Sequence, residues 1–401
     1  MKVLYIHQYF RTPDEGGGVR SYYLTKELVK KGIDVEVISA HNKDYYETKN
    51  IDGVTVHFLP VLYDNAFSFK KRIIAFLRFA LLACKKSRSV KRIDLCYVMT
   101  TPLTTGLIAL WIKWTRNIPY IFEVGDLWPL IPVEVGAIKS TFLKSILFRF
   151  EKVCYSNASG VVALSPGIAE YIQAIVPKKP IKVIPNIADI DFFQPEEKQE
   201  SLKQKYSINN KFVISYTGTF GIANHLEYLL EAAKASLLLP VKFLLVGEGA
   251  EKEKLLKLKK ESNLENVDFQ PHTDRKGIKE ILNVSDAIYI SFINIKSINT
   301  GSPNKLFDGL ASGKLIITNF DGWIKKLIES NDAGFSYPTE NTPLFTEKLL
   351  TFIDNKEILK SFQKNSRQLA ENSFSLEMLS QRQFDFIRIL INPIQNSLAD
   401  T

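Results

Sequence analysis

Short apolar runs that alternate with helix-length segments constrain this chain more than any other feature. Each run is rich in β-branched or aromatic residues, which favours a strand. In the first half the runs are Val3–Ile6, Val35–Ser39, Val54–Leu59, Leu95–Met99, Tyr120–Phe122, Val161–Leu164 and Lys182–Ile184. In the second half they are Phe212–Thr217, Phe243–Val246, Val267–Phe269, Ala287–Phe292 and Leu315–Thr318. Strand, helix and strand at this spacing predict an α/β fold with parallel strands and helices on both faces.

The length of the chain indicates two such domains. Its 401 residues exceed the size at which a single core keeps growing. Proline, acidic residues and glutamine break the periodicity at 185–209. We predict two Rossmann-like, doubly wound parallel-sheet domains, 1–186 and 187–373, with a ligand cleft between the carboxyl ends of their sheets. The remaining residues, 374–401, have a helical pattern that we expect to return to the N-terminal domain.

The heptapeptide from Ser302 to Asp308 is the most informative motif. Ser302 is a good N-cap, and Pro303 is tolerated in a first helical turn, while Gly313 is suited to ending the helix. Such a helix start directs free N–H groups toward an anion, and Lys305 adds a full charge there. Asp308, on the same face, is placed to accept hydrogen bonds from sugar hydroxyls. The alternative is an ordinary capped helix with a surface lysine and aspartate.

Two glycine turns follow neighbouring strands of the second half. Gly218 and Thr219 close one strand, and Gly247 and Glu248 close the next. Each turn is common in α/β proteins and weakly informative alone. Together with Asn304 and the rest of the heptapeptide at one sheet edge, they predict a cradle for a nucleotide diphosphate.

A third glycine-rich loop follows the first strand. Gly16, Gly17 and Gly18 would let backbone N–H groups approach an anion, and Arg20 strengthens that interpretation. The spacing differs from GxGxxG, and no acidic residue ends the second strand, which argues against a dinucleotide site. A plain surface loop is the alternative.

Two carboxylates end a strand of the first half. Glu123 and Asp126 stand at the expected carboxyl edge of the sheet, where they would orient a sugar or take a proton. A salt-bridged glutamate and a loop-capping aspartate are the alternatives.

Metal-ligand patterns are weak throughout. We interpret Asp189-Ile190-Asp191 as linker, and the five histidines have no ligand spacing. The three cysteines form no CxxC pair, which favours a reducing compartment. We therefore expect no metal and no cofactor.

Basic charge is concentrated in the first half. Residues 1–180 hold 25 Lys and Arg against 15 Asp and Glu, and residues 66–92 hold nine basic residues and no acidic one. Because apolar residues are interspersed, this stretch is suited to an anionic membrane interface, or else to a core-facing helix with solvated ends. The apolar run Ile73–Cys84 is shorter than the about 20 residues that span a bilayer, and Met1-Lys2 leads directly into a strand rather than a signal peptide. We expect a cytoplasmic protein, peripheral at the inner face of the cell membrane, that binds no nucleic acid.

Taken together, these motifs resemble GT-B glycosyltransferases of the retaining family 4. Within that family they are most similar to WbuB-like bacterial surface-polysaccharide enzymes, of the N-acetyl-L-fucosamine transferase type. The resemblance covers nearly the whole chain and rests on His7–Phe10 with Gly16–Gly18, Asp126–Pro129, Val183–Asn186, Gly218–Gly221, Gly247–Gly249, Ser302–Asp308 with Gly313, and Phe374–Glu377.

The resemblance implies that the second domain binds a nucleotide sugar and the first an acceptor. Gly218 and Thr219 would lie near the diphosphate, Ser302 to Lys305 would donate to it, and Asp308 would hold the ribose. Gly16 to Gly18 would face the donor phosphate or the acceptor.

The chain also departs from the family pattern. Thr300 stands where many members have Glu eight residues before the ribose carboxylate, which here is Asp308. The usual Arg and Lys of the phosphate clamp are missing after Gly218, and Gly125 replaces a common His. Backbone N–H groups and Lys305 would then neutralise more of the pyrophosphate.

We therefore predict an enzyme that transfers a sugar, with retention, from a nucleotide-diphosphate donor, UDP-linked, to a lipid-linked or growing glycan acceptor in surface polysaccharide biosynthesis. Asp126, Glu123 and Lys305 are the predicted catalytic residues. Two alternatives remain at this point: a sugar-nucleotide epimerase of the same fold, and a non-catalytic protein that binds a membrane surface or polyanion.

Overall fold

The computed structural model describes residues 1–64, 67–208 and 210–399, and the side chains of these residues except 69 and 392–399. The chain divides into two compact units, each of which is described here by itself. The first comprises Met1–Pro185 and Leu379–Thr401, and the second comprises Asn186–Met378.

The first unit is built on an eight-stranded sheet in the order β3-β4-β2-β1-β5-β6-β7-β8, parallel except for β3. Its strands are β1 (Lys2–Ile6), β2 (Asp34–His41), β3 (Glu47–Ile51), β4 (Val54–Pro60), β5 (Leu95–Met99), β6 (Tyr120–Val124), β7 (Gly160–Ala163) and β8 (Ile181–Val183). Its helices are η1 (Pro13–Glu15), α1 (Arg20–Lys30), α2 (Phe69–Ser87), α3 (Thr105–Arg116), α4 (Leu130–Glu134), α5 (Thr141–Asn157), α6 (Pro166–Ile175) and α15 (Leu376–Ala399).

The second unit has a six-stranded, wholly parallel sheet in the order β11-β10-β9-β12-β13-β14. Its strands are β9 (Phe212–Thr217), β10 (Val241–Val246), β11 (Val267–Gln270), β12 (Ala287–Ile290), β13 (Leu315–Thr318) and β14 (Gly334–Ser336). Its helices are α7 (Glu200–Lys205), η2 (Ile222–Asn224), α8 (Glu227–Ala235), α9 (Lys252–Glu261), α10 (Arg275–Val284), η3 (Ile298–Thr300), α11 (Asn304–Ala311), α12 (Trp323–Ser330), α13 (Thr342–Asp354) and α14 (Lys356–Phe374).

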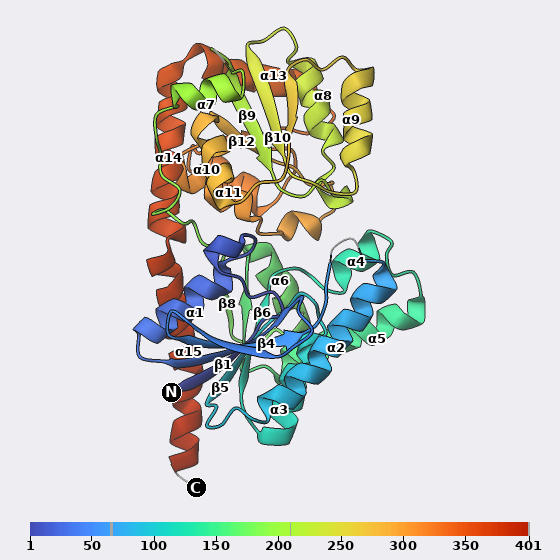
Figure 1. Cartoon of the computed structure of the whole chain (residues 1–401), viewed down its shortest axis with the longest axis vertical. Coiled ribbons are helices and arrows are strands. Elements are labelled where there is room, and N and C mark those ends of the chain that lie inside the picture. Colours follow the sequence, from blue (N-terminus) through green and yellow to red (C-terminus); the bar gives the residue numbers. More distant parts are fainter. Residues whose placement is uncertain (65–66, 209, 400–401) are drawn as a thin grey trace. The chain divides into compact units, whose positions relative to one another are not determined.

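Both sheets confirm the predicted parallel α/β architecture, because helices cover both of their faces (Figure 1). Central strands are consequently apolar on both sides: every residue of Val3–Ile6 and of Leu315–Ile317 is fully buried. In each sheet the strand order reverses beside the first strand of the unit, between β1 and β5 and between β9 and β12. Such switch points are the usual ligand positions in open α/β sheets.

Two strands were not foreseen. β3 pairs antiparallel with β4 at the sheet edge, and β14 adds a short sixth strand to the second sheet. α14 and α15 are separated at Ser375, which is extended and bridges to Ala188. α14 therefore belongs to the second unit, while the residues of α15 from Leu379 group with the first.

The helices α2, α3 and α5 of the first unit lie near one another (Figure 1), with α3 in contact with both of the others. All three leave large apolar side chains exposed. We call these side chains the apolar surface: Ile74, Leu77 and Leu81 of α2, Leu107 and Trp114 of α3, and Phe142, Leu143 and Ile146 of α5. α2 covers most of the basic stretch 66–92, of which residue 66 lies outside the described residues. None of the described helices combines the length and hydropathy that crossing a membrane requires.

Candidate functional site

The predicted site residues of the second half gather at the carboxyl edge of its sheet, at the switch point. Gly218 follows β9, Gly247 follows β10, and the connection after β12 leads into α11. Their strands are neighbours in the sheet, and β9 lies between the other two. The sequence motifs are therefore brought together as expected.

The two glycine turns pack backbone against backbone. Gly218 and Gly247 have φ values of +140° and +151°, which L side chains rarely adopt. A Cβ on Gly247 would stand 1.9 Å from the carbonyl oxygen of Gly218. The amide of Phe220 donates to the carbonyl of Glu248 at 2.9 Å, which joins the turns again. Only glycine at position 247 permits this contact, so the two turns are packed together.

The segment before α11 is fixed by side chains from elsewhere in the second unit. Asn186 Nδ2 donates to the carbonyl of Ser302 at 2.6 Å, and the indole N–H of Trp323 donates to the carbonyl of Gly301 at 2.8 Å. The helix begins at Asn304 with Pro303 as its N-cap, and no side chain caps it. The prediction that Ser302 is the N-cap was wrong, because its backbone and hydroxyl are instead held by Asn186.

Lys305 extends from the first turn of α11 over the glycine turn. Its Nζ lies 3.8 Å from the ring centroid of Tyr216 and would be 3.1 Å from a Cβ on Gly218. Within the described part of the chain, no carboxylate forms an ion pair with this ammonium group. Burial lowers the pKa of Lys305 to about 7, since desolvation disfavours its charge. An anion in the turn would restore the charged form.

Asp308 is half-buried one turn further along α11. Burial raises the pKa of its carboxyl to about 7; nearby Arg275 opposes this shift and Asp189 adds to it. Asp189 itself pairs with Arg275 at 2.7 Å, so the aspartate of the DxD sequence serves an ion pair in this structure. Asp308 is thus a perturbed carboxyl on the same short helix as Lys305.

The other predicted donor-site residues are exposed at this edge. Thr219 contributes its carbonyl, which accepts from the Tyr216 hydroxyl at 2.9 Å and from Asn224 Nδ2 at 3.0 Å. Glu248 pairs with Lys252 at 2.6 Å, and Asn304 is the first residue of α11. The sequence analysis assigned no role to Tyr216, Asn224 or Asn186.

In the first unit the structure overturns two assignments. Glu123 is fully buried inside β6, where its two carboxylate oxygens accept from Arg20 Nε and Nη2, each at 3.0 Å. The Tyr97 hydroxyl donates to the same carboxylate at 2.5 Å. The second carboxylate oxygen therefore already accepts two hydrogen bonds, so Glu123 is not placed to hold a sugar.

The prediction that Arg20 assists anion binding at the Gly16–Gly18 loop was also wrong. Arg20 is 5% exposed and also donates to the carbonyls of Ile184 and Pro185. Because α1 starts with Arg20 facing the sheet, its guanidinium joins the ends of β6 and β8 instead of facing a ligand. The salt-bridged glutamate, considered above as an alternative, is what the structure contains.

The remaining predicted residues of the first unit are accessible. Gly16, Gly17 and Gly18 form the loop before α1, and a Cβ on Gly16 or Gly18 would meet nothing within 4 Å. Asp126 is exposed just after β6. His7 is buried after β1 beside the Ser21 hydroxyl, 2.8 Å away, and burial lowers its pKa to about 4. This edge therefore offers the accessible carboxylate of Asp126 and an open glycine loop.

No group of three or more His, Cys, Asp or Glu side chains suited to a metal ion occurs among the residues that the structure describes. The metal-free expectation stays a prediction.

Comparison with protein families assigns both halves of the chain. Residues 15–187 match the Glycosyl transferase 4-like domain, and residues 198–369 match Glycosyl transferases group 1. The chain belongs to the glycosyltransferases. Its two parallel-sheet α/β domains have the GT-B fold.

Among curated relatives, this glycosyltransferase is 22% identical to an enzyme of Campylobacter jejuni over 89% of its own length and 92% of the relative. That relative is N-acetylgalactosamine-N,N'-diacetylbacillosaminyl-diphospho-undecaprenol 4-alpha-N-acetylgalactosaminyltransferase.

Among solved structures, sucrose-phosphate synthase from Thermosynechococcus elongatus aligns with a TM-score of 0.78 at 16% identity, covering 97% of this chain and 98% of that one. Anabaena HepE in complex with UDP and glucose aligns with a TM-score of 0.70 at 16% identity, covering 97% and 99%. These likenesses concern the fold.

Proposed function

We propose that this glycosyltransferase moves a sugar from a UDP-linked donor to a lipid-linked glycan acceptor, with retention of anomeric configuration, in surface polysaccharide biosynthesis. The observation that carries the proposal is the position of Lys305 over the Gly218 turn at the start of α11, where no carboxylate among the described residues forms an ion pair with it. The complex of Anabaena HepE with UDP and glucose supports UDP as the nucleotide. The undecaprenol-linked substrate in the name of the Campylobacter relative supports a lipid-linked acceptor.

The chemistry follows from charge development. When the bond between the sugar and the diphosphate breaks, negative charge grows on the leaving pyrophosphate oxygens. Lys305, the N–H groups that open α11 and the glycine turns would stabilise that charge from fixed positions. Asp308 would accept from the ribose hydroxyls, and Asp126 would orient a sugar hydroxyl. We expect no metal requirement, so EDTA should leave the rate unchanged.

Replacing Lys305 with Ala should lower turnover by about 10²–10³, because one preorganised donor to the leaving group is lost. The measurement is steady-state transfer at saturating UDP-sugar. Since the free ammonium has a pKa of about 7, wild-type protein should also take up a proton on binding UDP above that pH. The variant should show no such uptake in calorimetry performed in buffers of different ionisation enthalpy.

Lys296→Ala is the matched control, because Lys296 is exposed on the same connection between β12 and α11. It should retain wild-type turnover. An unchanged rate for Lys305→Ala would remove Lys305 from the mechanism. Product analysis with and without acceptor separates transfer from the epimerase alternative, which needs no acceptor, and NMR of the first-formed glycoside tests retention.

The apolar surface supports the proposal that the enzyme works at a membrane. Ile74 and Leu81 of α2 are 65% and 73% exposed, and Phe142 of α5 is 77% exposed. α3 contacts both helices, and α2 also carries the basic residues Lys70, Lys71 and Arg72. Apolar side chains flanked by cations are suited to the interface of anionic lipids. A lipid-linked acceptor would be presented there.

Replacing Lys70, Lys71 and Arg72 with Ser should release the protein from anionic vesicles, because each basic residue near the surface contributes about 1 kcal/mol. Phe142→Ser should weaken the same binding through lost apolar insertion. Co-sedimentation with vesicles of anionic and of neutral lipid measures both effects. Leu238→Ser, at a fully exposed leucine of the second unit, is the control. Full retention of the triple variant would contradict membrane attachment by this surface.

A further inference from the structure

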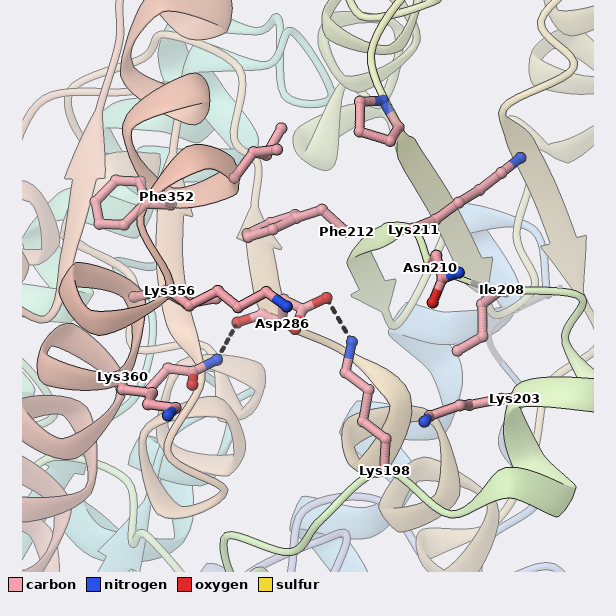
Figure 2. A pocket seen from close by; sticks show the side chains of 14 residues that line it. Lys198, Lys203, Ile208, Asn210, Lys211, Phe212, Asp286, Phe352, Lys356 and Lys360 are labelled. Carbon is pink, nitrogen blue, oxygen red and sulfur yellow. Dashed lines mark hydrogen bonds and ion pairs between the residues drawn. The ribbon is translucent and has the colours of Figure 1, made fainter.

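A second cationic site lies at the opposite, amino-terminal edge of the second sheet. A cavity of about 510 Å³ opens where β9 and β12 begin, and α14 forms another wall (Figure 2). Five lysines and a single acidic residue line it: Lys198, Lys203, Lys211, Lys356 and Lys360 with Asp286. None of these residues belongs to the donor site described above. The volume is within the range of small-molecule sites, about 300–1,000 Å³.

The acidic residue of this lysine pocket is already engaged. One carboxylate oxygen of Asp286 accepts from Lys198 Nζ at 2.5 Å and from the Val213 amide at 2.8 Å. The Asp286 carbonyl accepts from Gln363 at 3.0 Å. In Figure 2, Lys198 and Lys356 extend toward Asp286 from opposite sides. The aspartate therefore compensates Lys198 and leaves the other ammonium groups of the pocket in excess.

The remaining lysines are only weakly compensated. Lys203 and Lys360 pair with Glu200 and Glu357, whose side chains are 78% and 82% exposed. Such solvated pairs contribute little and exchange readily. Among the described residues, neither Lys211 nor Lys356 has an ion-pair partner. Like charges held around one cavity repel one another, and a multiply charged anion would relieve that repulsion.

The interior beside the pocket shows the same excess of positive charge. Lys314, just before β13, is 6% exposed, and burial lowers its pKa to about 8. Asp286 and Glu196 act against this shift, while Lys198 adds to it.

The pocket also has an apolar wall. Phe212, Phe352 and Leu359 line it and are 8%, 5% and 9% exposed. Inorganic phosphate would leave this wall in contact with water, whereas an organic body of sugar or nucleoside size would cover it.

From this combination we propose that the lysine pocket is a binding site for an organic phosphate that carries two phosphate groups on a sugar-sized body. The phosphates contact the lysines of α7 and α14, and the organic body packs against Phe212 and Phe352. Binding there is independent of the donor site, which uses the other edge of the sheet.

The test is calorimetric titration of the full-length protein with fructose 1,6-bisphosphate as the probe. The double variant Lys203→Gln/Lys356→Gln should lose at least about tenfold in affinity, because two charge-assisted hydrogen bonds disappear. The matched control, Lys234→Gln/Lys364→Gln, removes the same charge at exposed positions outside the pocket. It should bind as wild type. Lys305→Ala should also bind as wild type, which separates this site from the donor site.

Each other outcome overturns the proposal. Equal loss in the control variant would show general electrostatic attraction, and loss only in Lys305→Ala would place the probe in the donor site. Inorganic phosphate that binds as tightly as the bisphosphate would exclude an organic ligand. Absence of fructose 1,6-bisphosphate binding to the wild type would refute the proposal. So would release of the double variant Lys203→Gln/Lys356→Gln from anionic vesicles if its affinity for the bisphosphate stayed unchanged.

Discussion

At the scale of single residues, the ion pair of Arg20 and Glu123 determines what the edge of the first sheet can do. The two residues are 103 positions apart, and both are nearly inaccessible. Two parallel hydrogen bonds join them. The Tyr97 hydroxyl also donates to the Glu123 carboxylate, and the Arg20 guanidinium also donates to two backbone carbonyls. This pair holds strand ends in place and leaves Asp126 as the accessible carboxylate after β6.

Replacing Glu123 with Ala should destabilise the first unit by about 3–5 kcal/mol, because it leaves a buried guanidinium without its partner. Urea unfolding followed by hydrogen exchange at amides of β6 measures the change. Lys30→Ala, which removes one partner of an exposed pair on α1, should change the stability by less than about 1 kcal/mol. A fully stable Glu123→Ala protein that has lost transfer activity would instead favour a catalytic glutamate.

The sequence predicted where Glu123 stands along its strand but not which way its side chain faces. Position follows from local patterning, whereas direction depends on a partner on α1 that only the folded sheet brings near. Lys305 illustrates the same limit. Its place in the helix start was predicted correctly, but Tyr216 beneath its ammonium group was not. In the sequence, Tyr216 cannot be distinguished from the other apolar residues of a buried strand.

At the scale of elements, the two glycine turns behave as one interlocked part. The carbonyl of Gly218 occupies the space that any side chain at position 247 would need. The turn after β10 therefore fixes the turn after β9, on which Lys305 rests.

Gly247→Ala should lower UDP affinity by about 10–100-fold, since about 1–3 kcal/mol of strain must be relieved by moving the Gly218 turn. Fluorescence or calorimetric titration with UDP measures the loss. Gly32→Ala is the control, because Gly32 also has a positive φ, +80°, but its Cβ would meet nothing within 4 Å. That control should cost some stability and leave UDP binding intact. Wild-type affinity in Gly247→Ala would show that the turns act separately.

Most strands were predictable because a strand buried on both faces is a continuous apolar run. β3 was not, since Glu47–Ile51 is polar and exposed at the sheet edge. The sequence feature that indicates β3 is the turn that follows it, not the strand itself. Asp52 and Gly53 have φ values of +51° and +86°, the backbone that a two-residue hairpin requires, and the Asp-Gly dipeptide is typical of it. β14 has three residues, too few for any periodicity.

At the scale of the whole molecule, α15 follows the second unit in the chain but packs with the first. Its Phe386 and Leu390 lie against Gly160 at the start of β7, where a Cβ would stand 2.7 Å and 2.6 Å from them. The helix can approach the strand this closely only because that position is glycine. The first core is therefore completed by the last helix.

Phe386→Ala should destabilise the first unit by about 3–5 kcal/mol through the cavity it leaves. Faster hydrogen exchange should be confined to that unit, notably β7, while UDP affinity of the second unit stays unchanged. Ile389→Ala on the same helix is the control, because Ile389 is 65% exposed. Exchange that rises equally in both units would contradict this assignment of α15.

The position of α15 also bears on biosynthesis. A ribosome that has finished Pro185 must still make the whole second unit before Leu379 emerges. At translation rates of about 5–20 residues per second, that interval is roughly 10–40 s. Throughout this interval, the site beside Gly160 that Phe386 and Leu390 of α15 later cover stays exposed in the nascent N-terminal half. Chaperone engagement during synthesis should therefore persist until α15 has emerged, and a polypeptide stalled before α15 should be a preferred substrate for quality-control proteases.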